Sequence, residues 1–311
     1  MSFSALILAT RRSALALQQS GWVKTELERC CPGLRVELSP LTTTGDRMPD
    51  RPLPQIGGKG LFTKELEEAL LGGRAHFAVH SLKDLPTELS PGLVLAAVPV
   101  REDPRDALIS RDGKPFAQLP HGVRIGTSSV RRAAQLLRLR PDARVVPLRG
   151  NLDTRLRKLR AGSFDALVVA AAGLRRMGWQ DQITEYFPES VLYPAIGQGA
   201  LGIEARAEDH TTLEALAALE DPWSRIATAA ERALLRHLGG GCQIPIAAYT
   251  RRDGNRLVLS AVVLRPDGAE MLQAEDAAAC CSVEAAEQIG RKTAEALIRQ
   301  GAGRLLGTKG P

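Results

Sequence analysis

Residues 124–139 read RIGTSSVRRAAQLLRL, and this stretch decides the fold. A short strand at 124–127 runs straight into Ser128 and Ser129, which can cap a helix, and an amphipathic pattern at 130–139 predicts that helix. The pattern continues with a strand at 144–148, a helix at 152–161 and a strand at 166–171. Alternation of strands and helices is typical of an α/β sheet with parallel strands.

The same module occurs earlier in the chain. Strands are predicted at 5–10, 35–43 and 76–80, with helices at 13–29 and 60–72. Two crossings, near 98–104 and 193–201, would join the two lobes as a hinge of two strands. In the residues after the second crossing, helices are predicted at 211–219, 222–238 and 283–299, and strands at 244–250, 256–265 and 269–276.

These patterns predict an α/β protein with two similar lobes. The lobes are expected to resemble those of periplasmic binding proteins, joined by a hinge, and a small α+β domain with an antiparallel sheet and helices is expected to follow. The predicted domains are residues 1–99 with 200–217, residues 105–193, and residues 222–311.

Composition excludes several classes of protein. Hydrophobic residues make up 44% of the 311 residues, which excludes a disordered chain, and no apolar run approaches the roughly 18 residues of a membrane span. The net charge is +6, and 33 of the 41 basic residues are Arg. Either genome composition or recognition of planar anions explains that excess.

The positive charge is local. Residues 105–193 hold 16 basic and 8 acidic residues, which suggests an anionic partner for this segment. Aromatic residues are only 4% of the chain, and base stacking needs them, so we expect neither nucleic acid nor a membrane as a partner.

The cysteines point to a reducing compartment. The five are Cys30, Cys31, Cys242, Cys280 and Cys281. An odd count at these spacings, behind an N-terminus that does not read as a signal peptide, predicts a cytoplasmic protein without a disulfide framework. No spacing of Cys or His predicts a metal site.

Hydroxyl and guanidinium groups follow the predicted strands of both lobes. Ligands of open α/β sheets bind beyond the carboxyl ends of the strands, where helix N-termini also favour anions. The side chains placed there are Arg11, Ser13, Thr127, Ser129, Arg131, Arg132, Arg149, Arg155 and Arg176. Ordinary helix capping explains the hydroxyls but not arginines in both copies, and together these residues suit a polycarboxylate.

Two further positions could carry chemistry. The segment HSLKDLP at 80–86 places Asp84 at the corresponding edge of the first lobe, where cations would keep it ionised, although it also reads as a turn residue before Pro86. Cys242 lies in the glycine-rich stretch GGGCQIP, which could present a thiol to a ligand. A buried small residue is the alternative for that cysteine.

Several of these strings together resemble one family. HSLKDLP, REDPRDAL, GTSSVRRAAQL, LRGNLDTRLRKL, PAIGQGALGIEAR and GGGCQIPIAAY are similar to porphobilinogen deaminases, also called hydroxymethylbilane synthases. The resemblance runs from Ile7 through Tyr249, about four fifths of the chain. It implies a transferase of porphyrin and haem biosynthesis, which condenses four porphobilinogen molecules head to tail with loss of ammonia to give 1-hydroxymethylbilane.

The resemblance also implies roles for individual residues. Asp84 would be the catalytic acid, stabilising the cation left when ammonia departs, and Cys242 would hold a dipyrromethane cofactor through a thioether. The other implied cofactor-binding residues are Ser81, Lys83, Thr127, Ser129, Arg131, Arg132 and Arg155. The implied substrate-binding residues are Arg11, Ser13, Arg149 and Arg176. Lys59 and Phe62 would belong to a mobile cover of the active site.

Two other classes share the predicted lobes. A solute-binding receptor would have no use for a tethered thiol, and a ligand-sensing regulator would need a DNA-binding helix pair ahead of the first strand. The family resemblance further suggests a monomer that passes its product to the next tetrapyrrole enzyme.

Overall fold

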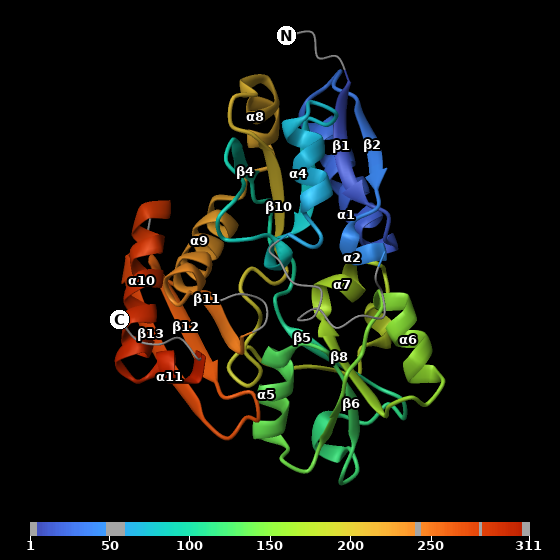
Figure 1. Cartoon of the computed structure of the whole chain (residues 1–311), viewed down its shortest axis with the longest axis vertical. Coiled ribbons are helices and arrows are strands. Elements are labelled where there is room, and N and C mark those ends of the chain that lie inside the picture. Colours follow the sequence, from blue (N-terminus) through green and yellow to red (C-terminus); the bar gives the residue numbers. More distant parts are fainter. Residues whose placement is uncertain (1–4, 48–59, 240–243, 280–281, 307–311) are drawn as a thin grey trace. The chain divides into compact units, whose positions relative to one another are not determined.

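The computed structural model describes residues 5–47, 60–239, 244–279 and 282–306 (Figure 1). The predicted positions Lys59 and Cys242 therefore lie outside the described residues. The chain divides into two compact units, one formed by 1–102 with 200–225 and the other by 103–199 with 226–311.

Unit 1 is a five-stranded mixed sheet with helices. Its strands are β1 (Leu6–Arg11), β2 (Val36–Leu41), β3 (Phe77–Ser81), β4 (Leu93–Ala97) and β10 (Leu201–Arg206). Its helices are α1 (Ala14–Cys30), α2 (Thr44–Arg47), α4 (Lys64–Leu71) and α8 (His210–Ala217), with a 3₁₀ turn at Leu82–Asp84. The strand order is β2-β1-β3-β10-β4.

Unit 2 contains a second five-stranded sheet, with the order β7-β6-β8-β5-β9, in which β7, β6 and β8 take the places that β2, β1 and β3 have in unit 1. Its strands are β5 (Asp106–Ser110), β6 (Arg124–Gly126), β7 (Arg144–Val146), β8 (Ala166–Ala170) and β9 (Glu185–Tyr186). Helices α5 (Val130–Leu139), α6 (Leu152–Arg160) and α7 (Ala171–Arg176) follow β6, β7 and β8. The shared arrangement of these parallel strands confirms the prediction of two similar α/β lobes.

One strand of each sheet runs against its neighbours. β10 is antiparallel to β3 and β4, and β5 is antiparallel to β8 and β9. The prediction of sheets with only parallel strands is therefore wrong. The segments interpreted as plain crossings between the lobes lead directly into the antiparallel strands β5 and β10. As a result, Asp106 at the start of β5 pairs with Ala170 at the end of β8.

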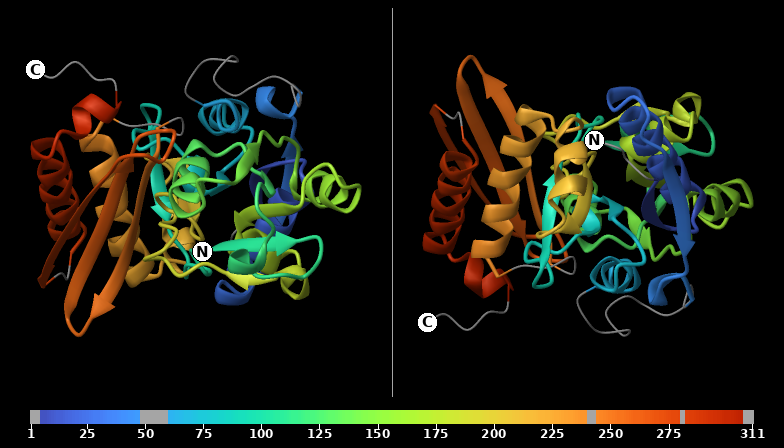
Figure 2. Two further views of the ribbon diagram at one scale, coloured as in Figure 1. Left: turned by 90° about the horizontal axis from the view of Figure 1, so that it is seen from below. Right: turned by 90° about the horizontal axis from the view of Figure 1, so that it is seen from above.

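The C-terminal part of unit 2 is an antiparallel sheet with helices, as predicted. Its elements are α9 (Pro222–His237), whose first residues belong to unit 1, β11 (Ile246–Asp253), β12 (Arg256–Leu264), β13 (Met271–Ala279), α10 (Val283–Arg299) and α11 (Ala302–Leu306). Helix α10 (red) packs on β12 and β13 (Figure 2). It approaches α9 closely at Gly290, where a Cβ would lie 2.2 Å from the carbonyl oxygen of Ala230.

This small sheet also packs on α5. Ala134 of α5 shares a buried apolar cluster with Tyr193, Ala247 and Val262. The turn between β12 and β13 contacts the same helix, since a Cβ on Gly268 would lie 2.4 Å from the carbonyl oxygen of Ala134. These contacts hold α5 through its middle and its C-terminal half and leave its N-terminus at the sheet edge. None of the described helices is long and apolar enough to cross a membrane.

Candidate functional site

In unit 2, the carboxyl ends of adjacent strands place most of the predicted anion-binding residues along one sheet edge. The neighbours β7, β6 and β8 end at the loops or helices that carry Arg149, Ser129 and Arg176. Ser128 connects two of these loops, because its Oγ bonds to the backbone N and O of Leu148, at 2.7 Å each. The sheet order therefore brings together side chains that are up to 47 residues apart in sequence.

The hydroxyl groups after β6 organise the start of α5. Thr127 Oγ1 accepts a hydrogen bond from the backbone N–H of Ser129 at 3.2 Å, and Ser129 Oγ accepts one from the N–H of Arg132 at 3.4 Å. Ser129 is thus the N-cap of α5. Capping explains both hydroxyls locally, so their proposed contact with a ligand is additional to this structural role.

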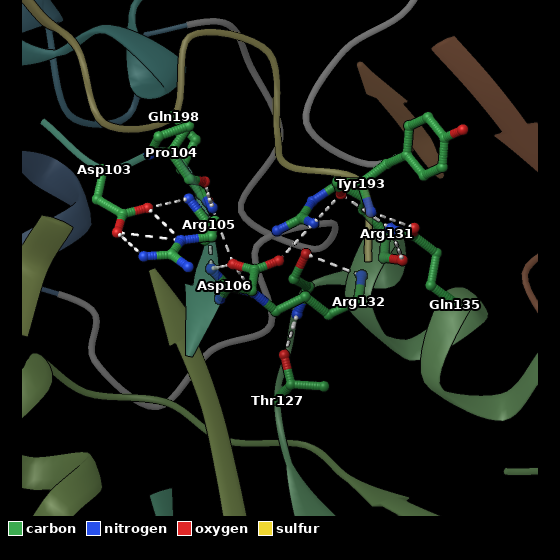
Figure 3. A network of polar contacts seen from close by, with 11 residues as sticks. Asp103, Pro104, Arg105, Asp106, Thr127, Arg131, Arg132, Gln135, Tyr193 and Gln198 are labelled. Carbon is green, nitrogen blue, oxygen red and sulfur yellow. Dashed lines mark hydrogen bonds and ion pairs between the residues drawn. The ribbon is translucent and has the colours of Figure 1, made fainter. Parts of the chain in front are cut away.

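Arg131 and Arg132 lie inside the protein, where they share one carboxylate (Figure 3). Arg131 Nη1 donates to Asp106 Oδ2 at 2.7 Å, and Arg132 donates to Asp106 Oδ1 through Nε at 3.0 Å and Nη2 at 2.7 Å. Gln198 Nε2 also donates to Oδ1, at 2.9 Å. Asp106 is fully buried, which would raise the pKa of its carboxyl group, but the two guanidinium groups outweigh burial and hold that pKa below its usual range.

The charges of this cluster do not cancel. Two guanidinium groups face one carboxylate, which leaves one positive charge on side chains that are at most 7% exposed. Nε of Arg131 is also buried without a hydrogen-bond partner in the described part of the chain. A buried charge is costly unless it is paired, so the cluster is suited to an additional anion.

Two of the remaining arginines of this edge donate to backbone carbonyl groups. Arg155 Nε donates to the carbonyl oxygen of Gly150 at 2.8 Å, and Arg176 Nη2 donates to that of Gly199 at 2.6 Å. Arg149, Arg155 and Arg176 are all partly exposed. Unlike the buried pair on α5, they can therefore meet a ligand from solvent.

Unit 1 has a comparable edge. Arg11 ends β1, Ser13 caps α1 by accepting from the N–H of Ala16 at 3.3 Å, and Ser81 ends β3. Gln19 of α1, the helix that follows β1, donates through Nε2 to Ser81 Oγ at 3.1 Å, which connects this helix to the end of β3. Lys83 and Asp84 follow in the 3₁₀ turn, where Asp84 is exposed and Lys83 partly buried.

Arg11 contacts both a carboxylate and an aromatic ring within unit 1. Its guanidinium group forms a two-point ion pair with Asp46, from Nε at 3.2 Å and Nη2 at 2.5 Å, and lies over the ring of Phe62 at 4.2 Å from the ring centroid. Phe62 is the one predicted cover residue within the described range, and here it contacts a predicted substrate-binding residue.

Four residues that contact the predicted set were not predicted from the sequence. They are Gln19, Asp46, Asp106 and Gln198. Asp106 lies in the string REDPRDAL. Its contact with the two arginines depends on the antiparallel strand β5, which was not predicted from the sequence patterns. In the described ranges, no group of three or more His, Cys, Asp and Glu side chains could hold a metal ion.

Each unit thus presents cationic and hydroxyl side chains at the carboxyl edge of its sheet, an arrangement typical of α/β proteins that bind anionic ligands. Comparison with known proteins identifies the family. Residues 6–214 match the model of the porphobilinogen deaminase dipyrromethane cofactor-binding domain, and residues 226–299 match the porphobilinogen deaminase C-terminal domain. The chain belongs to the porphobilinogen deaminase family.

Relatives with that name cover nearly the whole chain. The porphobilinogen deaminase of Syntrophotalea carbinolica is 51% identical over 98% of this chain and 96% of its own length. That of Sorangium cellulosum is 53% identical over 87% of this chain and 90% of its own. The predicted family, enzyme class and cofactor are thereby confirmed.

Two solved structures of low sequence identity have a similar course of chain. The methionine-binding protein MetQ is 14% identical, with a TM-score of 0.44 over 73% of this chain and 94% of its own. The periplasmic VFT2 domain of Bordetella pertussis BvgS is 17% identical, with a TM-score of 0.40 over 69% of this chain and 86% of its own.

Proposed function

We propose that this chain condenses four porphobilinogen molecules to 1-hydroxymethylbilane and that residues at the carboxyl edges of its sheets bind the carboxylates of its ligands. Four molecules of substrate and one of water give one product and four of ammonia. The observation that supports this assignment most strongly is the buried pair Arg131 and Arg132 on one carboxylate, Asp106. Its uncompensated positive charge is suited to a ligand whose pyrrole rings each carry two carboxylates.

The residues of unit 2 fit the dipyrromethane. When bound, this cofactor supplies the terminal pyrrole carbon from which the chain of rings grows. Arg131 and Arg132 would take a carboxylate of this group, because the orphaned Nε of Arg131 and the net positive charge are both satisfied by an anion. Thr127, Ser129 and Arg155 of unit 2 would also bind the cofactor, as would Ser81 and Lys83 of unit 1. Cys242 would be the attachment point.

The remaining residues would act on porphobilinogen. Arg11, Ser13, Arg149 and Arg176 would bind the carboxylates of the incoming ring and the growing chain. Asp84 would face the pyrrole N–H of the ring that loses ammonia, where its negative charge stabilises the developing cation and its oxygen can hold a proton. The exposure of Asp84 in the 3₁₀ turn is consistent with a side chain that meets a ligand.

Turnover of porphobilinogen by the purified protein tests this assignment. We expect four molecules of ammonia per molecule of 1-hydroxymethylbilane, and a protein mass that exceeds the sequence mass by one dipyrromethane. Mass increments of one pyrrole ring should appear at low substrate concentration. Binding of porphobilinogen without release of ammonia would instead favour a receptor.

The assembly and cellular setting are also proposals. We infer that the enzyme works as a monomer in the cytoplasm, that it passes its product to the next tetrapyrrole enzyme, and that its domains are residues 1–99 with 200–217, 105–193 and 222–311. Light scattering during size-exclusion chromatography tests the first point, since a monomer should give about 33 kDa.

A further inference from the structure

We propose that Asp46 is a positioning residue, which orients the guanidinium group of Arg11 toward a carboxylate of porphobilinogen. This inference rests on the proposed function of Arg11 as a substrate-binding residue. Asp46 lies on α2, 35 residues from Arg11 in sequence, and the ion pair between them spans two different segments of unit 1. The family resemblance implies no role for Asp46.

The contacts of Arg11 define which edge of its guanidinium group remains for a ligand. The guanidinium group makes two hydrogen bonds to described residues, and both go to Asp46, from Nε at 3.2 Å and from Nη2 at 2.5 Å. A guanidinium group has a side edge formed by Nε and Nη2 and an end edge formed by Nη1 and Nη2. Asp46 occupies the side edge, so the end edge can bind a substrate carboxylate through two parallel hydrogen bonds.

The ring of Phe62 covers one face of the guanidinium group of Arg11. The Cζ atom of Arg11 is 4.2 Å from the centroid of the Phe62 ring, and this ring packs so closely on Gly45 that a Cβ there would lie 2.2 Å from it. An arginine held on one edge and one face loses little rotational freedom when it binds substrate, because that freedom is already restricted.

Asp46 is itself held in place. Its Oδ2 accepts from Thr43 Oγ1 at 2.7 Å, and the side chains of Asp46 and Arg11 are 22% and 25% exposed. Partial burial would raise the pKa of this carboxyl group, but the hydrogen bonds from Arg11 and Thr43 outweigh it and hold the pKa below its usual range. Asp46 is therefore ionised wherever the enzyme works near neutral pH.

The sign of one kinetic effect separates positioning from simple charge balance. If Asp46 only neutralised Arg11, Asp46→Asn would make the site more positive and would lower the KM for porphobilinogen. If Asp46 orients Arg11, the same change frees the side chain, and we expect KM to rise about 5- to 10-fold with kcat changed less than about twofold.

Two comparisons complete the experiment, with intact mass confirming cofactor loading of every variant. Asp46→Asn in an Arg11→Lys background should change KM by less than about twofold, because Lys cannot make the two-point contact. Glu65→Gln is the matched control: Glu65 holds the same helix through the N–H and Oγ1 of Thr44, at 2.7 and 2.6 Å, without touching Arg11. It should leave KM within about twofold of wild type.

A second variant covers the case in which Asp46→Asn does not fold. Asp46→Glu keeps the charge but moves the carboxylate by one methylene, so positioning predicts a raised KM and charge balance predicts no change. An unchanged or lowered KM in either variant, or an equal effect of Glu65→Gln, would overturn the inference. Failure of the wild-type protein to release ammonia from porphobilinogen would instead overturn the proposed function itself.

Discussion

Asp106 accepts two hydrogen bonds from Arg132, at 3.0 Å from Nε and 2.7 Å from Nη2, in an ion pair whose two side chains are both buried. Arg131 adds a second guanidinium group to the same carboxylate. Removing one partner of a buried pair leaves the other charge uncompensated, which costs far more than losing an exposed pair. This relationship leads to the first prediction.

Asp106→Asn should lower the free energy of unfolding by about 3–5 kcal/mol at pH 7, because two guanidinium groups then lie buried without a counter-ion. Urea unfolding measures the change. Asp267→Asn is the control, since its pair with Arg265 is exposed to solvent and its loss should cost far less than that of the buried pair. Equal losses in the two variants would show that Asp106 is not an essential counter-ion.

The same pair predicts a pH dependence. The folded-state pKa of Asp106 lies below the unfolded value of about 3.9, so its stabilisation is present above about pH 4 and is lost as the pH falls toward the folded pKa. The stability difference between wild type and Asp106→Asn should therefore stay constant from pH 8 to 5 and shrink below about pH 4. Urea midpoints across this range provide the measurement, and a difference that grows in acid would contradict it.

Asp84→Asn should retain the dipyrromethane but reduce kcat by about 10²–10³-fold, the scale of losing one charge-stabilising group in an active site. Intact mass and single-turnover assays report the two quantities separately. Glu88→Gln is a suitable control, because Glu88 is an exposed carboxylate four residues away. Near-normal turnover of Asp84→Asn would remove Asp84 from the proposed role.

Cys242→Ser should abolish covalent attachment, so that the protein mass falls to that of the sequence alone. Cys31→Ser, a change at a partly buried cysteine of unit 1, should keep the full mass increment. Mass spectrometry of the undenatured preparations distinguishes the two. A cofactor that remains attached in Cys242→Ser would place the thioether elsewhere.

Gly268→Ala should destabilise unit 2 by more than about 2 kcal/mol. Gly268 has a φ of 76°, and its added Cβ would meet the backbone of α5 at 2.4 Å. Gly254→Ala is the matched control, at a turn with a φ of 60° but no atom within 4 Å of the added Cβ, so only backbone strain of about 1 kcal/mol is expected. Thermal unfolding of both variants should separate packing from strain.

The alternating strands and helices of both lobes could be predicted from sequence. The helix predicted at 130–139 is α5 at Val130–Leu139, and the strand predicted at 5–10 is β1 at Leu6–Arg11. These elements have local patterns, apolar periodicity and a capping Ser, which act within one turn or one strand. The family could likewise be identified, because its motifs are contiguous strings.

Only the tertiary structure decided which charges are paired. Asp106 meets Arg132 because β5 runs antiparallel to β8, and Asp46 meets Arg11 because α2 follows the strand beside β1. Such contacts join residues 26 and 35 positions apart and depend on strand order, which no local pattern encodes. The sequence by itself determined the repeated α/β modules, the family and the cationic strand ends, whereas strand order determined which arginines are buried on a carboxylate and which remain partly exposed to meet a ligand.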